Sequence, residues 1–256
     1  TLNSLGPISI KQINEAFEET TGRPPTDESA IILQRLPGLG RIGAESLDRQ
    51  FVDTFILDGL KAEDAVGLLA QGDGDWLDSD WKNAVEDFGS FYIAARLASN
   101  KQVGMAVSFV QRNADRKNRI IVSDLLSAFF RLDEPIDLGG LSFSGGKFFH
   151  VELGDSKLQR LNIIDSSFDS LDVTDAEPVE VKIAQSVISR VSGVTSPEHL
   201  PPWLVDCLVE DFQNLKTLVA IREAGLSVAQ TFLLSSLRKL FLQAGSGRRE
   251  SSMYKG

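Results

Sequence analysis

Every fifth residue between Leu141 and Val173 is apolar from Phe143 onward. The residues two places earlier alternate between large and small side chains, and those one place earlier are mostly polar. A period of five matches neither an α-helix nor a β-strand. It fits a chain that turns a corner every five residues and points one side chain inward from each edge, as in a square, right-handed β-helix. The apolar positions are Phe143, Phe148, Leu153, Leu158, Ile163, Phe168 and Val173.

This segment supplies seven edges, fewer than two coils of four edges, so it cannot bury its core without neighbours. The alternative is a meander of short strands whose apolar residues fall on fives by coincidence. We expect the coil, with helices predicted within residues 81–132 covering its first open end. The pattern breaks at residues 172–178, and residues 181–191 are expected to form a helix with Val187 and Val191 inward.

The pattern of capping, apolar and turn residues in residues 1–70 predicts helices joined to a hairpin. Ser9 should cap the first helix, with Gln12 as its capping-box partner, and the second helix should begin at residue 26 or 27. A short hairpin is expected within residues 39–50, followed by a third helix. The apolar residues expected on one side of that helix are Phe51, Val52, Phe55, Ile56 and Leu60.

The predicted fold class is α+β, with four units along the chain. A winged-helix-like unit at residues 1–70 and a helical bundle at residues 71–136 precede the short β-helix at residues 137–177. Residues 178–256 form the last unit, which is helical with a winged-helix alternative. Its helices are expected at about residues 203–223, after the helix start marked by Pro201 and Pro202, and at about 228–243, after a capping box of Ser227 and Gln230.

The composition restricts the class of protein. The chain of 256 residues has 26 Lys and Arg against 36 Asp and Glu, and a net charge of −10 argues against nucleic acid as a partner. It has no run of eighteen apolar residues, so no membrane span is expected. The N-terminus shows no signal peptide, and the single cysteine, Cys207, fits a reducing, cytoplasmic compartment. The chain starts at Thr1 without Met, and we expect it to be a piece of a longer polypeptide.

The segment from Phe51 to Ala62 resembles the end of the winged-helix module in NACHT-type (STAND) signalling NTPases. In that family a hairpin leads into Phe-Val-His, and a helix with an acidic residue and Leu-Ala-Ala follows. The residues in matching places are Phe51, Val52, Asp58, Leu60 and Ala62. The family's nucleotide-facing histidine is Asp53 here, and a carboxylate repels a phosphate, so the resemblance does not imply direct nucleotide contact. The period-five segment is similar to pentapeptide-repeat proteins, in a degenerate version with few Ala, Asp and Asn at the flanking places.

The residue spacings in this sequence do not match the metal-binding and phosphate-binding motifs that its acidic, glycine and histidine residues suggest. The acidic residues between Asp73 and Asp80 lack the glycine and glutamate of a calcium loop, and they are better explained as loop and as caps of a helix starting near Trp81. The glycines from Gly139 to Gly146 lack the spacing of a phosphate loop. His150 and His199 have no neighbours spaced for zinc. We therefore predict no catalytic residue, no metal site and no cofactor.

A basic patch is the one candidate binding site in the sequence. It consists of Arg112, Arg116, Lys117 and Arg119, set against a single acid, Asp115. We predict that it contacts a protein partner; the alternative is a solvated helix end.

The function expected from these features is recognition without catalysis. The first hypothesis is a regulatory or sensing segment of a larger bacterial signalling NTPase of the NACHT class. Its partner would be another protein or an NTPase module upstream in the same chain. The alternatives are a self-contained protein-interaction scaffold, in which residues 1–70 would expose no apolar docking face, and a winged-helix regulator that binds DNA.

Overall fold

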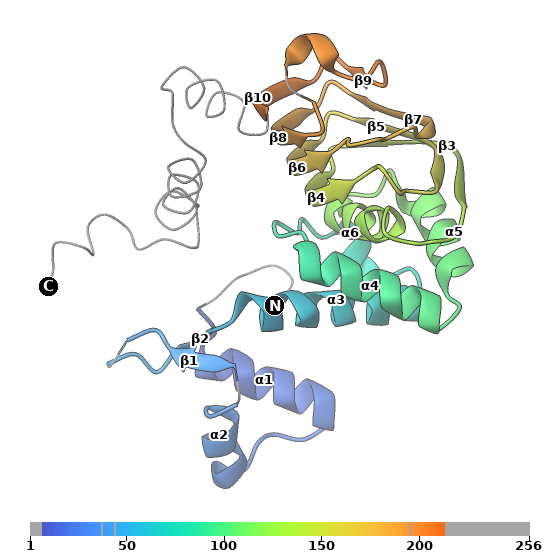
Figure 1. Cartoon of the computed structure of the whole chain (residues 1–256). Coiled ribbons are helices and arrows are strands. Elements are labelled where there is room, and N and C mark those ends of the chain that lie inside the picture. Colours follow the sequence, from blue (N-terminus) through green and yellow to red (C-terminus); the bar gives the residue numbers. More distant parts are fainter. Residues whose placement is uncertain (1–6, 37, 44, 195, 213–256) are drawn as a thin grey trace, which may run out of the picture. The chain divides into compact units, whose positions relative to one another are not determined.

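The computed structural model describes residues 7–36, 38–43, 45–194 and 196–212. The chain divides into two units, Thr1–Asp211 and Phe212–Gly256, and the described elements lie in the first, with only Phe212 beyond it. Within these residues the fold is α+β, with helices first and a stack of parallel strands after them (Figure 1).

Two parallel sheets form a β-solenoid (Figure 1). One sheet has the strand order β3-β5-β7-β9 and the other β10-β8-β6-β4, so each coil gives one strand to each sheet and there are about four coils. The strands of the first sheet are β3 (Ile136–Ser144), β5 (Leu158–Ile164), β7 (Val179–Ala184) and β9 (Leu204–Val205). Those of the second are β4 (Lys147–Glu152), β6 (Ser167–Asp172), β8 (Val187–Ser192) and β10 (Leu208–Phe212).

The strand register confirms the period of five. Leu141 pairs with Leu161 and Leu161 with Val181, so a coil takes twenty residues, or four edges of five. All seven apolar residues from Phe143 to Val173 are buried, at 0–5% exposure. Inside the coils Phe148 stacks on Phe168 of the next coil, with ring centroids 4.7 Å apart. The inward positions therefore form one continuous apolar core.

The solenoid continues past residue 177, and the helix expected at residues 181–191 is wrong. These residues form β7 and β8, with Val191 buried but Val187 largely exposed. Their burial follows the coil, because Ile183 and Ile188 continue the series of fives beyond Pro178 and are fully buried. The helix expected to start near residue 203 is also wrong, since β9 and β10 begin at Leu204 and Leu208. The remainder of that helix and the one expected at residues 228–243 lie outside the described residues.

Each coil turns from the first sheet to the second through a residue with left-handed backbone. The φ angles are 71° at Gly145, 49° at Asp165, 52° at Gln185 and 54° at Asp206. Only glycine adopts this conformation without steric cost, so three of the four corners carry some strain. The first coil also holds two extra residues beside Gly139 and Gly140, since its register with β5 shifts between Asp137 and Leu141.

Helices cover the first end of the solenoid, as expected. The helices α5 (Val103–Asn113) and α6 (Arg119–Phe129) contact its strands, and α4 (Asp87–Ser99) packs against α6. The Ser123 hydroxyl on α6 accepts a hydrogen bond from the Lys147 backbone N–H at 3.0 Å, and Gln111 on α5 donates to the Leu138 carbonyl at 3.2 Å. The first coil therefore presents its backbone to polar groups of the helices. The helix expected to start near Trp81 begins later, at Asp87.

The N-terminal elements follow the predicted order. They are α1 (Ile10–Thr21), α2 (Asp27–Leu33), β1 (Leu39–Arg41), β2 (Arg49–Phe51) and α3 (Thr54–Gln71). The capping box is present, because Ser9 Oγ accepts from the Gln12 N–H and Gln12 Oε1 accepts from the Ser9 N–H. Thr26 caps α2, and β1 and β2 pair as an antiparallel hairpin. A winged-helix identity for this unit stays a prediction.

Candidate functional site

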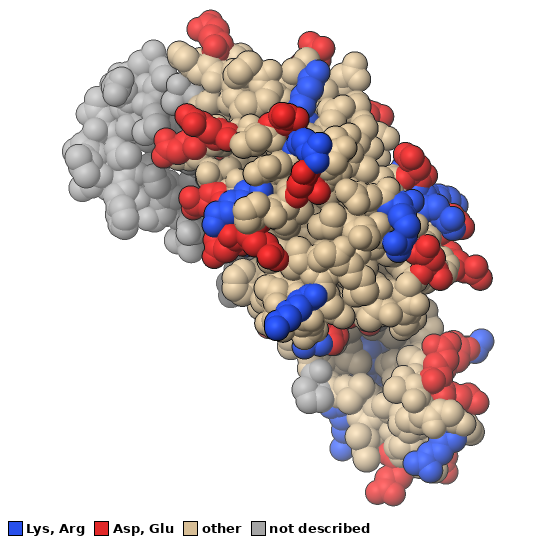
Figure 2. Space-filling model, turned by 90° about the vertical axis from the view of Figure 1, so that its right-hand side faces the viewer, with Lys and Arg blue, Asp and Glu red and all other residues tan. Residues whose placement is uncertain are grey.

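The basic patch predicted from the sequence meets the acidic residues predicted as loop. Arg116 lies 2.7 Å from the Asp78 carboxylate and Arg112 lies 3.9 Å from that of Asp73. Arg119 donates to the Ala114 carbonyl, and Lys117 is exposed. Two of the four cations are thus matched by acids of the same chain. On the face drawn in Figure 2, Lys and Arg side chains likewise lie interspersed with those of Asp and Glu. Binding of a partner by this patch stays a prediction.

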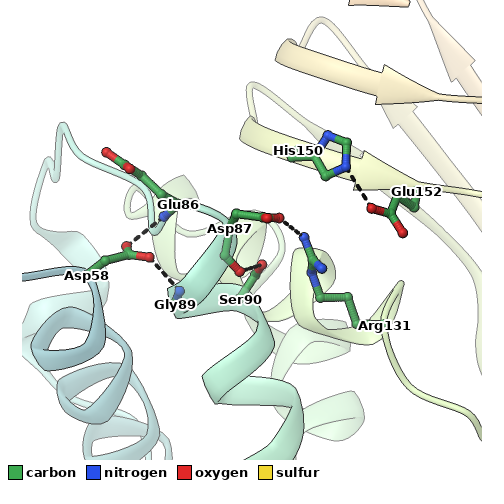
Figure 3. Close-up of polar contacts among 8 residues, drawn as sticks. All are labelled: Asp58, Glu86, Asp87, Gly89, Ser90, Arg131, His150 and Glu152. Atoms are coloured by element: carbon green, nitrogen blue, oxygen red, sulfur yellow. Dashed lines mark hydrogen bonds and ion pairs between the residues drawn. The ribbon is translucent and has the colours of Figure 1, made fainter. Parts of the chain in front are cut away.

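Three buried charged residues fix the loop before α4, and Figure 3 shows one of them, Asp58. Asp58 on α3 accepts hydrogen bonds from the backbone N–H groups of Glu86, at 2.7 Å, and Gly89. The Glu86 side chain does not cap α4, so Asp58 caps that helix from a neighbouring one. Lys61 donates to the Ala84 carbonyl at 3.4 Å. The third buried charge, Asp124 on α6, accepts from the Val85 N–H at 2.9 Å.

Glycine at position 89 is required by this arrangement. A Cβ there would lie 2.8 Å from both carboxylate oxygens of Asp58 and from the Cβ of Val85. Beside it, Arg131 forms an ion pair with Asp87, whose backbone carbonyl accepts from the Ser90 hydroxyl (Figure 3). The start of α4 is therefore held by groups from both α3 and the end of α6.

Two carboxyl groups beside this loop, those of Asp124 and Glu86, have raised pKa values. Complete burial raises the pKa of Asp124 to about 8, against the opposing effects of the Val85 N–H and Lys61. Partial desolvation and, second, the nearby Asp58 raise the pKa of Glu86, although that residue is largely exposed to solvent. Burial is the largest cause of both shifts, and the charge of the nearby Asp58 adds to it.

A cleft of about 140 Å³ opens beside this loop. It brings together two lysines, one from α3 and one from β4, and two acids, so its lining is nearly balanced in charge. No histidine, cysteine or serine lines it, so it offers no nucleophile of those kinds. The lining residues are Lys61, Asn83, Ala84, Val85, Glu86, Lys147, Phe149 and Asp169.

The two histidines and the cysteine lie apart from this cleft lining. His150 on β4 lies 2.9 Å from the Glu152 carboxylate, on the outer side of the solenoid (Figure 3). His199 contacts the Ser196 hydroxyl at 2.8 Å in a 3-10 turn. Burial raises the pKa of the half-buried Cys207 thiol. Among the described residues no group of three His, Cys, Asp or Glu is placed to hold a metal ion.

Several large apolar side chains on α3 and α4, and just before α3, are exposed to solvent. Phe55 and Phe88 meet edge to face with ring centroids 6.0 Å apart, and Phe88 lies directly over Gly59 of α3. Phe91 is one turn further along α4. These side chains are 41–67% exposed. We call this surface the apolar ridge, made of Val52, Phe55, Ile56, Leu60, Phe88 and Phe91.

The hairpin adjoins the apolar ridge. A Cβ at Gly38 would lie 3.3 Å from the Ile56 side chain, and one at Gly40 would lie 2.4 Å from that of Val52. Of the five residues that the sequence placed on one side of this helix, Phe55, Ile56 and Leu60 do lie on α3. Phe51 instead ends β2 and Val52 precedes α3, so their placement on the helix was wrong. The sequence did not show that this side faces solvent, because the buried side of α3 instead carries the charged Asp58 and Lys61 among its apolar residues.

None of the described helices is both long and apolar enough to cross a membrane. No family model, curated protein or solved structure matches this chain.

Proposed function

We propose that this chain is a non-catalytic regulatory segment that acts through contact with another protein, within a larger signalling NTPase of the kind that the Phe51–Ala62 segment resembles. The observation that carries the proposal is the apolar ridge. Large apolar surfaces left in contact with water mark sites of protein association, since their exposure is otherwise unfavourable. The ridge begins in the same segment that carries the resemblance.

The ridge is built on a rigid support. Its α3 and α4 halves are fixed to each other by the Asp58 hydrogen bonds to Glu86 and Gly89 and by the contact of Phe55 with Phe88. A surface that is already ordered before association loses less entropy when a partner binds. This favours recognition by a preformed face.

The choice between a regulatory segment and a self-contained scaffold depends on this face. A scaffold that presents only its solenoid has no use for exposed apolar groups within residues 1–70. Val52 and Phe55 are each 67% exposed, which favours the regulatory segment.

The sequence of the gene on both sides of residues 1–256 tests the proposal first. We expect a phosphate-loop motif upstream, and its absence would end the proposal. The second step is nucleotide hydrolysis by the parent protein, with and without Phe55→Ser. The substitution should change the basal rate or its activation, because the ridge would contact the motor. A rate profile identical to that of the parent would contradict a regulatory role for the ridge.

The scaffold remains the second candidate, and the aligned outer side chains of the second sheet favour it. His150 lies in register with Ser170, and Glu152 with Asp172, so successive coils present ordered polar rows. Substituting His150 with Ala should weaken association with a partner under this alternative. The ridge substitution Phe55→Ser should not weaken it.

A further inference from the structure

We propose that the cleft beside the loop before α4 binds a small amino acid, with its carboxylate toward Lys61 and its ammonium toward Glu86 and Asp169. The cleft shares no residue with the apolar ridge, so its occupant is independent of the proposed function. The charged side chains of the lining differ in burial, and this difference gives the cleft a buried end and an exposed end.

Lys61 supplies a buried cation at the inner end of the cleft. It is 3% exposed and belongs to the lining. Among the described residues, its Nζ donates one hydrogen bond, to the Ala84 carbonyl at 3.4 Å, which is longer than the usual range of about 2.7–3.2 Å. An ammonium group has three N–H donors, and leaving buried donors without acceptors is costly. An anionic group in the cleft would complete the hydrogen bonding of Lys61.

The buried acids nearest to Lys61 do not fill this place. Asp58, one helical turn away on α3, accepts hydrogen bonds from two backbone N–H groups at the start of α4. Asp124 accepts from the Val85 N–H, and burial raises its pKa to about 8, so it is mostly protonated at neutral pH. In the described part of the chain neither acid forms an ion pair with Lys61. The Lys61 ammonium therefore remains available to a ligand.

The exposed end of the cleft carries two acids from separate parts of the fold. Glu86 lies in the loop before α4 and Asp169 lies on β6, and both are exposed to solvent. Desolvation, the charge of Asp58 and the charge of Asp169 raise the pKa of Glu86, so the two exposed carboxyl groups are close enough to repel each other. A cation placed between them would relieve that repulsion.

A ligand with a single charge gains little in this cleft, because the lining holds two lysines and two acids. A simple carboxylate would meet Glu86 and Asp169 as well as Lys61 and Lys147, and a simple amine would meet the same four groups. A zwitterion gains from both pairs when its carboxylate lies at the buried end and its ammonium at the exposed end. An amino acid therefore matches the charges of the lining.

The volume and the apolar part of the lining restrict which amino acid fits. The cleft holds about 140 Å³, well below the roughly 300–1,000 Å³ of pockets for drug-sized ligands, so the ligand has few non-hydrogen atoms. Ala84, Val85 and Phe149 supply apolar surface, and Phe149 is 39% exposed without a ligand. A small apolar side chain that covers this ring would be favoured by the hydrophobic effect.

The test titrates the ¹⁵N-labelled full chain of 256 residues with L-alanine, propionate and ethylamine at neutral pH. Propionate lacks the ammonium of L-alanine and ethylamine lacks its carboxylate, so the two analogues are matched deletions. Amide chemical shifts of residues 83–86 report on binding. We expect L-alanine to bind at least about fivefold more tightly than either analogue, with a preference that shrinks as salt rises.

Three variants assign the binding to the two ends of the cleft. Asp169→Asn should weaken L-alanine by about fivefold and leave propionate unchanged or tighter, because only the ammonium loses its partner. Lys61→Met should weaken both L-alanine and propionate by about tenfold or more. Asp155→Asn is the matched control, because this exposed carboxyl follows β4 outside the cleft lining and should change nothing.

Any of three results would overturn the inference. They are equal affinities for all three ligands, affinities for L-alanine that neither Asp169→Asn nor Lys61→Met changes, and no shift of the loop amides with L-alanine up to about 50 mM. Circular dichroism melting shows whether each variant is folded. If the buried Lys61→Met variant does not fold, the exposed Asp169→Asn variant decides the outcome through its opposite effects on L-alanine and propionate.

Discussion

The hydroxyl of Ser186 accepts a hydrogen bond at 3.1 Å from the backbone N–H of Ser166, twenty residues earlier. The Ser166 hydroxyl accepts in turn from the Gly146 N–H at 2.9 Å. Each hydroxyl also donates within its own coil, to the carbonyls of Ile164 and Ala184. These buried serines therefore join three successive coils at the corner where the chain passes between the two sheets.

Replacing Ser186 with Ala should lower the free energy of unfolding by about 1–3 kcal/mol, because the buried Ser166 N–H loses its acceptor. Urea unfolding followed by circular dichroism measures the difference. Ser144→Ala is the matched control, since Ser144 is exposed on β3 and should change stability by less than about 0.5 kcal/mol. Equal stability of the two variants would show that the hydroxyl ladder contributes nothing.

Replacing Asp124 with Asn should remove a pH dependence of stability. The pKa of Asp124 is raised from 3.8 to about 8 in the folded chain, so the folded state holds a proton that the unfolded state releases. Its contribution is fully present below about pH 4 and is lost as pH rises toward 8, by up to about 1.4 kcal/mol per unit. Asn keeps an oxygen to accept from the Val85 N–H. We expect the variant to equal the parent near pH 4 and to exceed it in unfolding free energy at pH 8.

Urea unfolding at several pH values checks this expectation. Asp155→Asn serves as the control at an exposed carboxyl and should leave the pH profile unchanged. Parallel profiles for the parent and Asp124→Asn would contradict a proton held at Asp124.

Replacing Gln185 with Gly should stabilise the chain by about 0.5–1 kcal/mol. Gln185 is exposed and has φ of 52°, so its Cβ is strained while glycine adopts this backbone freely. The opposite change, Gly145→Ala at the equivalent corner, should destabilise by a similar amount. Thermal melting measures both. The explanation by corner strain requires opposite signs, and it fails if both substitutions act in the same direction.

Replacing Asp58 with Ala should destabilise the chain by about 2–4 kcal/mol, because the N–H groups of Glu86 and Gly89 lose their acceptor. Asp58→Asn keeps one acceptor oxygen and should lose less. Hydrogen exchange of the first turn of α4 reads the effect locally, and faster exchange there is expected in both variants. Unchanged protection of the Gly89 amide would argue against capping by Asp58.

The core of the solenoid could be predicted because its signal is local. Counting every fifth residue from Phe143 to Val173 is enough to identify the buried positions. The count failed after residue 177 because Pro178 takes the next place in the series. Beyond it, Val187 and Val191 stand four apart and so imitate a helix.

The buried charges could not be predicted, because their partners are distant in the sequence. Asp124 accepts from a residue 39 positions earlier, and Asp58 accepts from residues 28 and 31 positions later. The same distance hides which side of α3 is buried. Sequence periodicity identifies an apolar stripe on α3. Whether that stripe is buried or exposed to solvent depends on where α4 packs, and periodicity does not show this.

The coil of twenty residues makes the height of this protein adjustable in whole steps. A tandem duplication of residues 147–166 would insert one coil and lengthen the solenoid by about 4.8 Å, the spacing between neighbouring strands. Every side chain after the insertion would keep its original orientation about the solenoid axis. A duplication of only five residues would instead rotate everything above it by a quarter turn and misalign the stack. Gene duplications in multiples of one complete circuit are therefore the ones that this architecture tolerates.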